Sequence, residues 1–81
     1  MKIVDTIPHP DMRISILYMN EKFIVRFENG PYEQQYKFTK EMAADVEQVK
    51  KTVDEAFLTS VRATFEQMHQ QFKQAYFRNC N

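Results

Sequence analysis

The chain has 81 residues, of which 43% are hydrophobic and 14% aromatic. It can therefore build one hydrophobic core, and both intrinsic disorder and a second domain are excluded. Its 11 basic residues equal its 11 acidic residues, so no net field draws it to nucleic acid, to a membrane surface or to acidic ligands.

The first predicted element is a candidate edge strand at residues 2–6. After a proline-flanked link, apolar residues alternate with polar ones at 13–19 and again at 22–28, and this period of two predicts two strands. A two-residue turn between these strands pairs Ile16 with Val25, and apolar residues then face apolar residues on both sides of the hairpin.

A second turn follows, because the Asn-Gly dipeptide at residues 29–30 is a strong hairpin signal. Pro31 has no N–H group with which to close a tight turn. We therefore expect a four-residue loop over 28–31, and this loop places Phe27 opposite Tyr32 on a third strand.

From Thr39, the expected N-cap, apolar residues recur at steps of three and four, and no Gly or Pro interrupts them. This spacing predicts one long helix. The apolar stripe turns by about 110° near Phe57, at 100° per residue. We interpret this rotation of the stripe as a helix that packs first on its own sheet and then on a partner. A kink near Thr52 or Phe57 is the alternative. The apolar positions of the helix are Met42, Val46, Val49, Val53, Phe57, Val61, Phe65, Met68, Phe72 and Tyr76.

These elements predict an α+β fold, a three-stranded antiparallel β-meander followed by one long C-terminal helix, with residues 2–6 as a candidate fourth strand. The single domain then comprises an N-terminal segment (1–11), the meander (12–38) and the helix (39–78). The predicted core is Ile14, Ile16, Tyr18, Phe23, Val25, Phe27, Tyr36, Phe38, Met42, Val46, Val49, Val53 and Phe57.

We find no catalytic constellation, and we expect no metal or cofactor. Neither His9, in a proline-flanked link, nor His69, on the flank of the helical stripe, has the ligand spacing of a metal site. The single cysteine, Cys80, cannot form an internal disulfide, which favours the reducing cytoplasm. No run approaches the roughly 20 apolar residues of a membrane helix, and we see no signal peptide.

Two ligand-binding functions stay open at this point, one for nucleic acid and one for a small molecule. Basic residues on the solvent side of the sheet could contact a nucleic-acid strand, although Glu28 and Glu33 lie among them. The tyrosines at 18, 32 and 36 could line a ligand pocket near one end of the sheet, although such residues more often cap a core with their hydroxyl groups in water. The candidate nucleic-acid contacts are Arg13, Lys22, Arg26 and Lys37.

The function that we expect is a small non-enzymatic interaction module, a homodimer or a subunit of a larger complex. An antiparallel pairing would place the acidic start of one helix beside the basic end of the other. The predicted interface is Val61, Phe65, Met68, Phe72, Tyr76 and Phe77. A candidate second interface on the open sheet face is Leu17, Met19 and Ile24.

Overall fold

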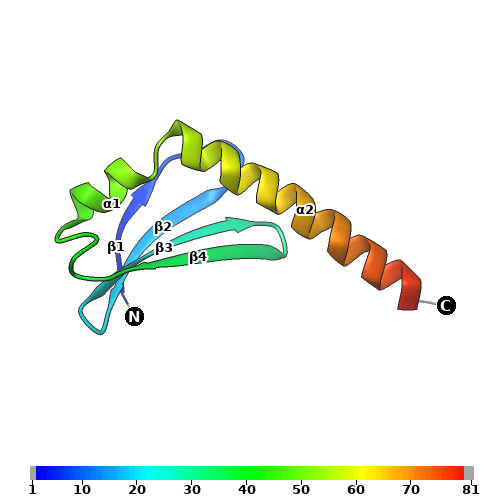
Figure 1. Ribbon diagram of the computed structural model, residues 1–81, viewed down its shortest axis with the longest axis horizontal. Helices are drawn as coiled ribbons and strands as arrows, with labels where there is room; N and C mark the ends of the chain where they lie inside the picture. Colours follow the sequence, from blue (N-terminus) through cyan, green and yellow to red (C-terminus); the bar gives the residue numbers. More distant parts are fainter. Residues whose placement is uncertain (1, 80–81) are drawn as a thin grey trace.

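The computed structural model describes residues 2–79 and shows one four-stranded sheet with two helices on one of its faces (Figure 1). The strands pair in sequence order and every pairing is antiparallel, so the predicted α+β meander is confirmed and the candidate edge strand is present. The strands are β1 (Lys2–Ile7), β2 (Arg13–Met19), β3 (Lys22–Asn29) and β4 (Tyr32–Phe38). The helices are α1 (Val46–Thr52) and α2 (Glu55–Asn79).

The first hairpin has the register expected from its sequence. Ile16 lies opposite Val25, and the turn residues Asn20 and Glu21 have φ angles of +52° and +62°. Two consecutive positive φ angles are the signature of a type I′ turn, whose twist matches that of the flanking strands. The apolar alternation and the turn length thus specify the same pairing.

The second hairpin differs from the expectation by two residues. Phe27 lies opposite Gln34 and not Tyr32, and the turn consists of Gly30 and Pro31 alone, with a φ of +59° at Gly30. The expected four-residue loop was wrong because the turn's own hydrogen bonds come from the two flanking residues. At the second turn position the missing N–H of proline is not needed, and its fixed negative φ matches a type II′ turn. A shift of two residues leaves every side chain on its expected face.

The predicted single helix is wrong, and the alternative of a break near Thr52 is correct. Residues 40–42 form a turn closed by hydrogen bonds to the Thr39 carbonyl. The N-cap of α1 is Asp45 rather than Thr39, because its carboxylate accepts the Gln48 N–H at 3.0 Å. Helix α1 therefore begins at Val46.

The junction between the helices consists of Val53 and Asp54. Val53 leaves the helical conformation, with φ −83° and ψ 73°. Asp54 then starts α2, since its carboxylate accepts the Phe57 N–H and its carbonyl accepts the Leu58 N–H, both at 2.9 Å. A side-chain cap of this kind satisfies N–H groups that a continuing helix would have bonded. The chain changes direction here without Gly or Pro.

The core lies between the sheet and both helices. Of the predicted core residues, Phe23, Val46 and Phe57 are half-buried against it, and three others are exposed. Tyr18, Tyr36 and Met42 are exposed, Met42 by 61%, because Met42 precedes α1 and Ala43 is buried in its place. The buried cluster is Met12, Ile14, Ile16, Val25, Phe27, Phe38, Ala43, Val49, Val53, Val61 and Phe65.

The opposite face of the sheet is less open than expected. Leu17 and Ile24 are each only 2% exposed, so two of the three residues of the candidate second interface are already covered within one chain. They face each other on the two central strands, with Ile3 and Lys37 beside them on the edge strands. In a twisted sheet, long flanking side chains can cover such a central pair.

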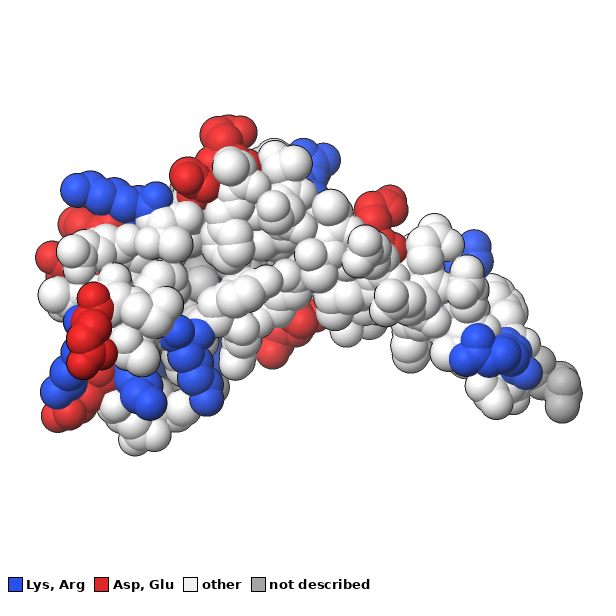
Figure 2. Space-filling view, viewed as in Figure 1, with Lys and Arg blue, Asp and Glu red and all other residues white. Residues whose placement is uncertain are grey.

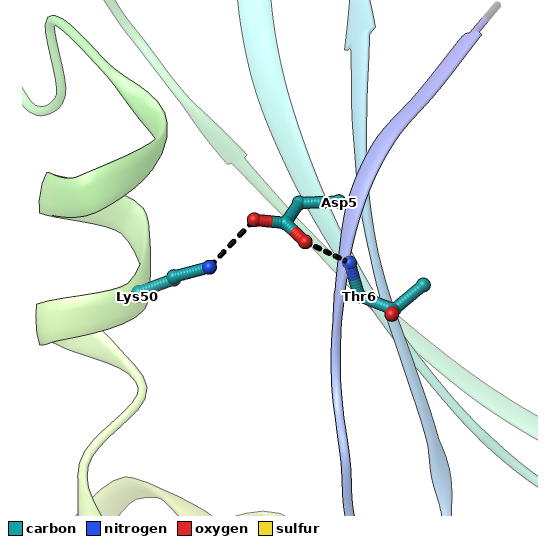
Figure 3. Close-up of polar contacts among 3 residues, drawn as sticks. All are labelled: Asp5, Thr6 and Lys50. Atoms are coloured by element: carbon teal, nitrogen blue, oxygen red, sulfur yellow. Dashed lines mark hydrogen bonds and ion pairs between the residues drawn. The ribbon is translucent and has the colours of Figure 1, made fainter.

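An ion pair joins α1 to the edge strand β1 (Figure 3). The Asp5 carboxylate contacts the Lys50 ammonium and also accepts the Thr6 N–H at 2.8 Å. The hydrogen bond from Lys50, with that from Thr6, lowers the pKa of Asp5 below its ordinary 3.8. The same bond raises the pKa of Lys50 above 10.5.

The Asp5–Lys50 pair predicts two pH windows. Because folding lowers the pKa of Asp5, its stabilisation is present above pH 3.8 and is lost as the pH falls through the lowered pKa. Because folding raises the pKa of Lys50, its stabilisation is full below pH 10.5 and is lost as the pH rises through the raised pKa. We expect Lys50→Met to flatten both dependences in urea titrations, whereas Lys51→Met should not. Parallel curves for Lys50→Met and the parent would contradict this.

The Asp54 cap predicts a measurable loss of stability. We expect Asp54→Ala to lower the free energy of unfolding by about 1 kcal/mol, because the Phe57 N–H in the first turn of α2 loses the carboxylate that accepts it. Glu41→Ala, the removal of an exposed acid before α1, is the control and should change little. Equal stabilities of the two variants in chemical denaturation would show that the cap does not hold the junction.

Candidate interaction surface

Helix α2 is longer than the sheet on which it lies. Its 25 residues extend about 37 Å at 1.5 Å per residue, whereas the seven residues of β4 extend about 24 Å. The far end of α2 therefore projects beyond the strands (Figure 1). The molecule is correspondingly elongated, with extents of 49 × 26 × 21 Å.

Hydrogen bonds at Gln34 and ring contacts at Phe57 fix the near half of α2 on the sheet. The Gln34 side-chain amide donates to the Val61 carbonyl at 3.0 Å, and the Tyr36 hydroxyl donates to Gln34 at 2.9 Å. The Phe57 ring packs edge-on against Tyr36 and Phe27, with centroids 5.2 and 5.6 Å away. These contacts set the line along which α2 crosses β4.

The last contact between α2 and the sheet is made at Tyr32. Its hydroxyl lies 3.0 Å from His69 Nδ1, and its ring meets that of Phe72 at a centroid distance of 6.0 Å. Phe72, at this contact, is still 58% exposed, and Tyr76 and Phe77, which follow it, are 57% and 64% exposed. The rings of Tyr76 and Phe77 contact each other at 5.7 Å.

The six residues of the predicted interface thus divide into two sets. Val61 and Phe65 are buried in the chain's own core, and Met68 packs against it, so these three do not form a free surface. The break at Asp54 is the reason, because it turns α2 so that its stripe meets the sheet from its first turn. Phe72, Tyr76 and Phe77 remain as the exposed set, and we call residues 72–79 the projecting end of α2.

A groove of about 390 Å³ lies beside α2, where the helix passes the β1–β2 link and the β3–β4 turn. Across it Arg62 forms an ion pair with Asp11 at 3.3 Å. Its lining combines buried or half-buried apolar residues with exposed polar ones. The apolar lining is Met12, Tyr32 and Phe65. The polar lining is Asp11, Asn29, Arg62, Glu66 and His69.

The four candidate nucleic-acid residues do share one face of the sheet, but acids accompany two of them. Arg13 lies opposite Glu28, and Arg26, largely covered, contacts Glu33 at 3.8 Å. Lys37 lies opposite Ile24, and Lys22 opposite Met19 at the hairpin end. Met19 itself is only half-buried.

The three tyrosines do not form one cluster. Tyr18 lies opposite Phe23, whereas Tyr32 lies opposite Asn29, six residues further along β3 and so about 20 Å away. Tyr36 lies between them and bonds to Gln34. The three tyrosines are therefore spread along the sheet rather than gathered at one end, and the two-residue shift in the pairing of β4 is what separates Tyr36 from Tyr18.

The histidines contact a neighbouring residue in the link and a tyrosine of the sheet. His9 Nδ1 accepts the Asp11 N–H at 3.1 Å, and His69 meets Tyr32. Across residues 2–79, no three His, Cys, Asp or Glu side chains gather as a metal site. Cys80 lies outside the described residues. Neither described helix has both the length and the apolar character that crossing a membrane requires.

Comparisons with protein-family models, with curated proteins and with solved structures found no match to this chain.

The buried Gln34 bridge predicts how firmly α2 is held. We expect Gln34→Ala to lower the free energy of unfolding by about 1–3 kcal/mol, because one buried and one part-buried hydrogen bond are lost. Gln35→Ala, at the neighbouring exposed position, should change it by less than about 0.5 kcal/mol. Guanidinium titrations followed by circular dichroism measure both. Similar values for the two variants would refute a role for the bridge.

Proposed function

We propose that this protein is a non-enzymatic interaction module that forms a homodimer through the projecting end of α2. The observation that carries the proposal is the exposure of Phe72, Tyr76 and Phe77 on a helical segment that extends past its own sheet. An exposed aromatic group of this kind marks a contact surface or an aggregation site in a lone chain. Aromatic residues are also the side chains enriched at protein interfaces.

The extent of the surface supports the same proposal. The chain exposes 5949 Å², whereas a compact monomer of 9.7 kDa exposes about 5,100 Å² by the usual scaling with mass. The excess is close to the roughly 800 Å² that each partner buries in an interface of standard size. The elongated shape therefore leaves about as much additional surface as a stable dimer needs.

The charge along α2 favours an antiparallel arrangement. Lys73 and Arg78 are its only Lys, Arg, Asp or Glu residues after Glu66, whereas Asp54 and Glu55 lie at its start. Figure 2 shows basic side chains at the far end of α2 and acidic ones nearer the junction with α1. Parallel helices would place like charges side by side, whereas antiparallel helices bring basic ends towards acidic segments. A two-fold axis gives this arrangement and is the commonest symmetry of oligomers.

This proposal predicts that Tyr76→Glu disrupts self-association. We expect the parent to sediment as a dimer at micromolar concentration, and the variant to raise the dissociation constant at least about tenfold, or roughly 1.4 kcal/mol, because the new carboxylate would be buried against aromatic rings.

Gln74→Glu places the same charge on another face of the projecting end and is the matched control, with circular dichroism to show that helix content is kept. A parent that sediments as a monomer throughout, or a dimer that Tyr76→Glu leaves unchanged, would refute the proposal.

A further inference from the structure

One side of α2 borders the groove and then continues past it. Arg62, Glu66 and His69 line the groove, and Lys73 and Phe77 follow at further steps of four residues. Steps of three and four keep residues on one side of a helix. The groove and the projecting end therefore share a single continuous surface of α2.

When two copies of this surface run in opposite directions, complementary side chains come to lie beside each other. In an antiparallel pair related by a two-fold axis between residues 69 and 70, Glu66 lies at the level of Lys73 of the second copy. The same register sets Arg62 at the level of Phe77 of the second copy. Opposite charges then meet in the first pair, and a guanidinium meets an aromatic ring in the second. A parallel pair in register would place each charge beside its own copy.

The lining of the groove suits the same occupant. Met12, Phe65 and Tyr32 offer an apolar contact, and Glu66 offers a carboxylate, whereas the Asp11 carboxylate is paired with Arg62. The projecting end brings exposed aromatic rings and, on this side of the helix, the Lys73 cation, and it carries no acid. The groove therefore matches the projecting end both in its apolar lining and in its charge.

We propose that the groove beside α2 binds the projecting end of α2 from a second copy of this chain, antiparallel, with Glu66 of each copy facing Lys73 of the other. This inference rests on the proposed self-association through α2 and adds to it the surface on which that end is received. The two-fold axis makes each contact occur twice, so every substitution acts at two places in the dimer.

The test is an exchange of charge at the two positions, measured by sedimentation at low ionic strength. Glu66→Lys alone and Lys73→Glu alone should each raise the dissociation constant about tenfold, because each places like charges together at two contacts. The double variant should return it close to that of the parent. Arg78→Glu, on another side of the helix, is the matched control and should not rescue Glu66→Lys.

The outcomes separate the two proposals. Rescue in the double variant, absent with Arg78→Glu, supports the proposed register. No coupling between positions 66 and 73, in a parent that still dimerises and that Tyr76→Glu still dissociates, overturns the register and leaves self-association standing. A parent that is monomeric throughout overturns the proposed function and this inference with it.

Discussion

The cap that Asp54 provides at the start of α2 determines how the rest of the molecule is arranged. It ends one helix and starts another within two residues, so the apolar face of α1 and that of α2 can both meet the sheet. Val49 from α1 and Val61 from α2 consequently lie in one core. A straight helix over the same residues would leave one of these two faces in water.

The cap also determines where α2 ends relative to the sheet. From Asp54 the helix crosses β4, is held by Gln34 and then by Tyr32, and continues beyond the strands. The apolar stripe that buries Phe65 in the core therefore carries on to Tyr76 where there is no sheet beneath it. We infer a partner from this continuity, since the stripe is apolar both where it packs on the chain's own sheet and where it extends past that sheet.

Local pattern predicted the sheet better than it predicted the helices. The alternation around Ile16 and Val25 fixed both the face and the register of the first hairpin, because a one-residue slip would expose its apolar side chains. The register of β4 was missed because Pro31 was treated as unable to sit in a two-residue turn.

The groove could not be predicted from the sequence, since its lining joins the β1–β2 link, the β3–β4 turn and α2 across more than 50 positions. Of the expected interface, Phe72, Tyr76 and Phe77 are exposed, and Val61 and Phe65 belong to the core. The helix break was only the alternative to a single helix, because Asp54 and Glu55 also fit the polar face of a continuous helix, and only the carboxylate bond of Asp54 distinguishes a cap from that face.

Amide hydrogen exchange along α2, measured at several protein concentrations, tests the central claim most directly. If the projecting end is completed by a second copy, the amides of residues 73–79 should exchange quickly in dilute solution and become protected as concentration rises, while those around Val61 stay protected throughout. Exchange at residues 73–79 that is fast and independent of concentration would contradict the account.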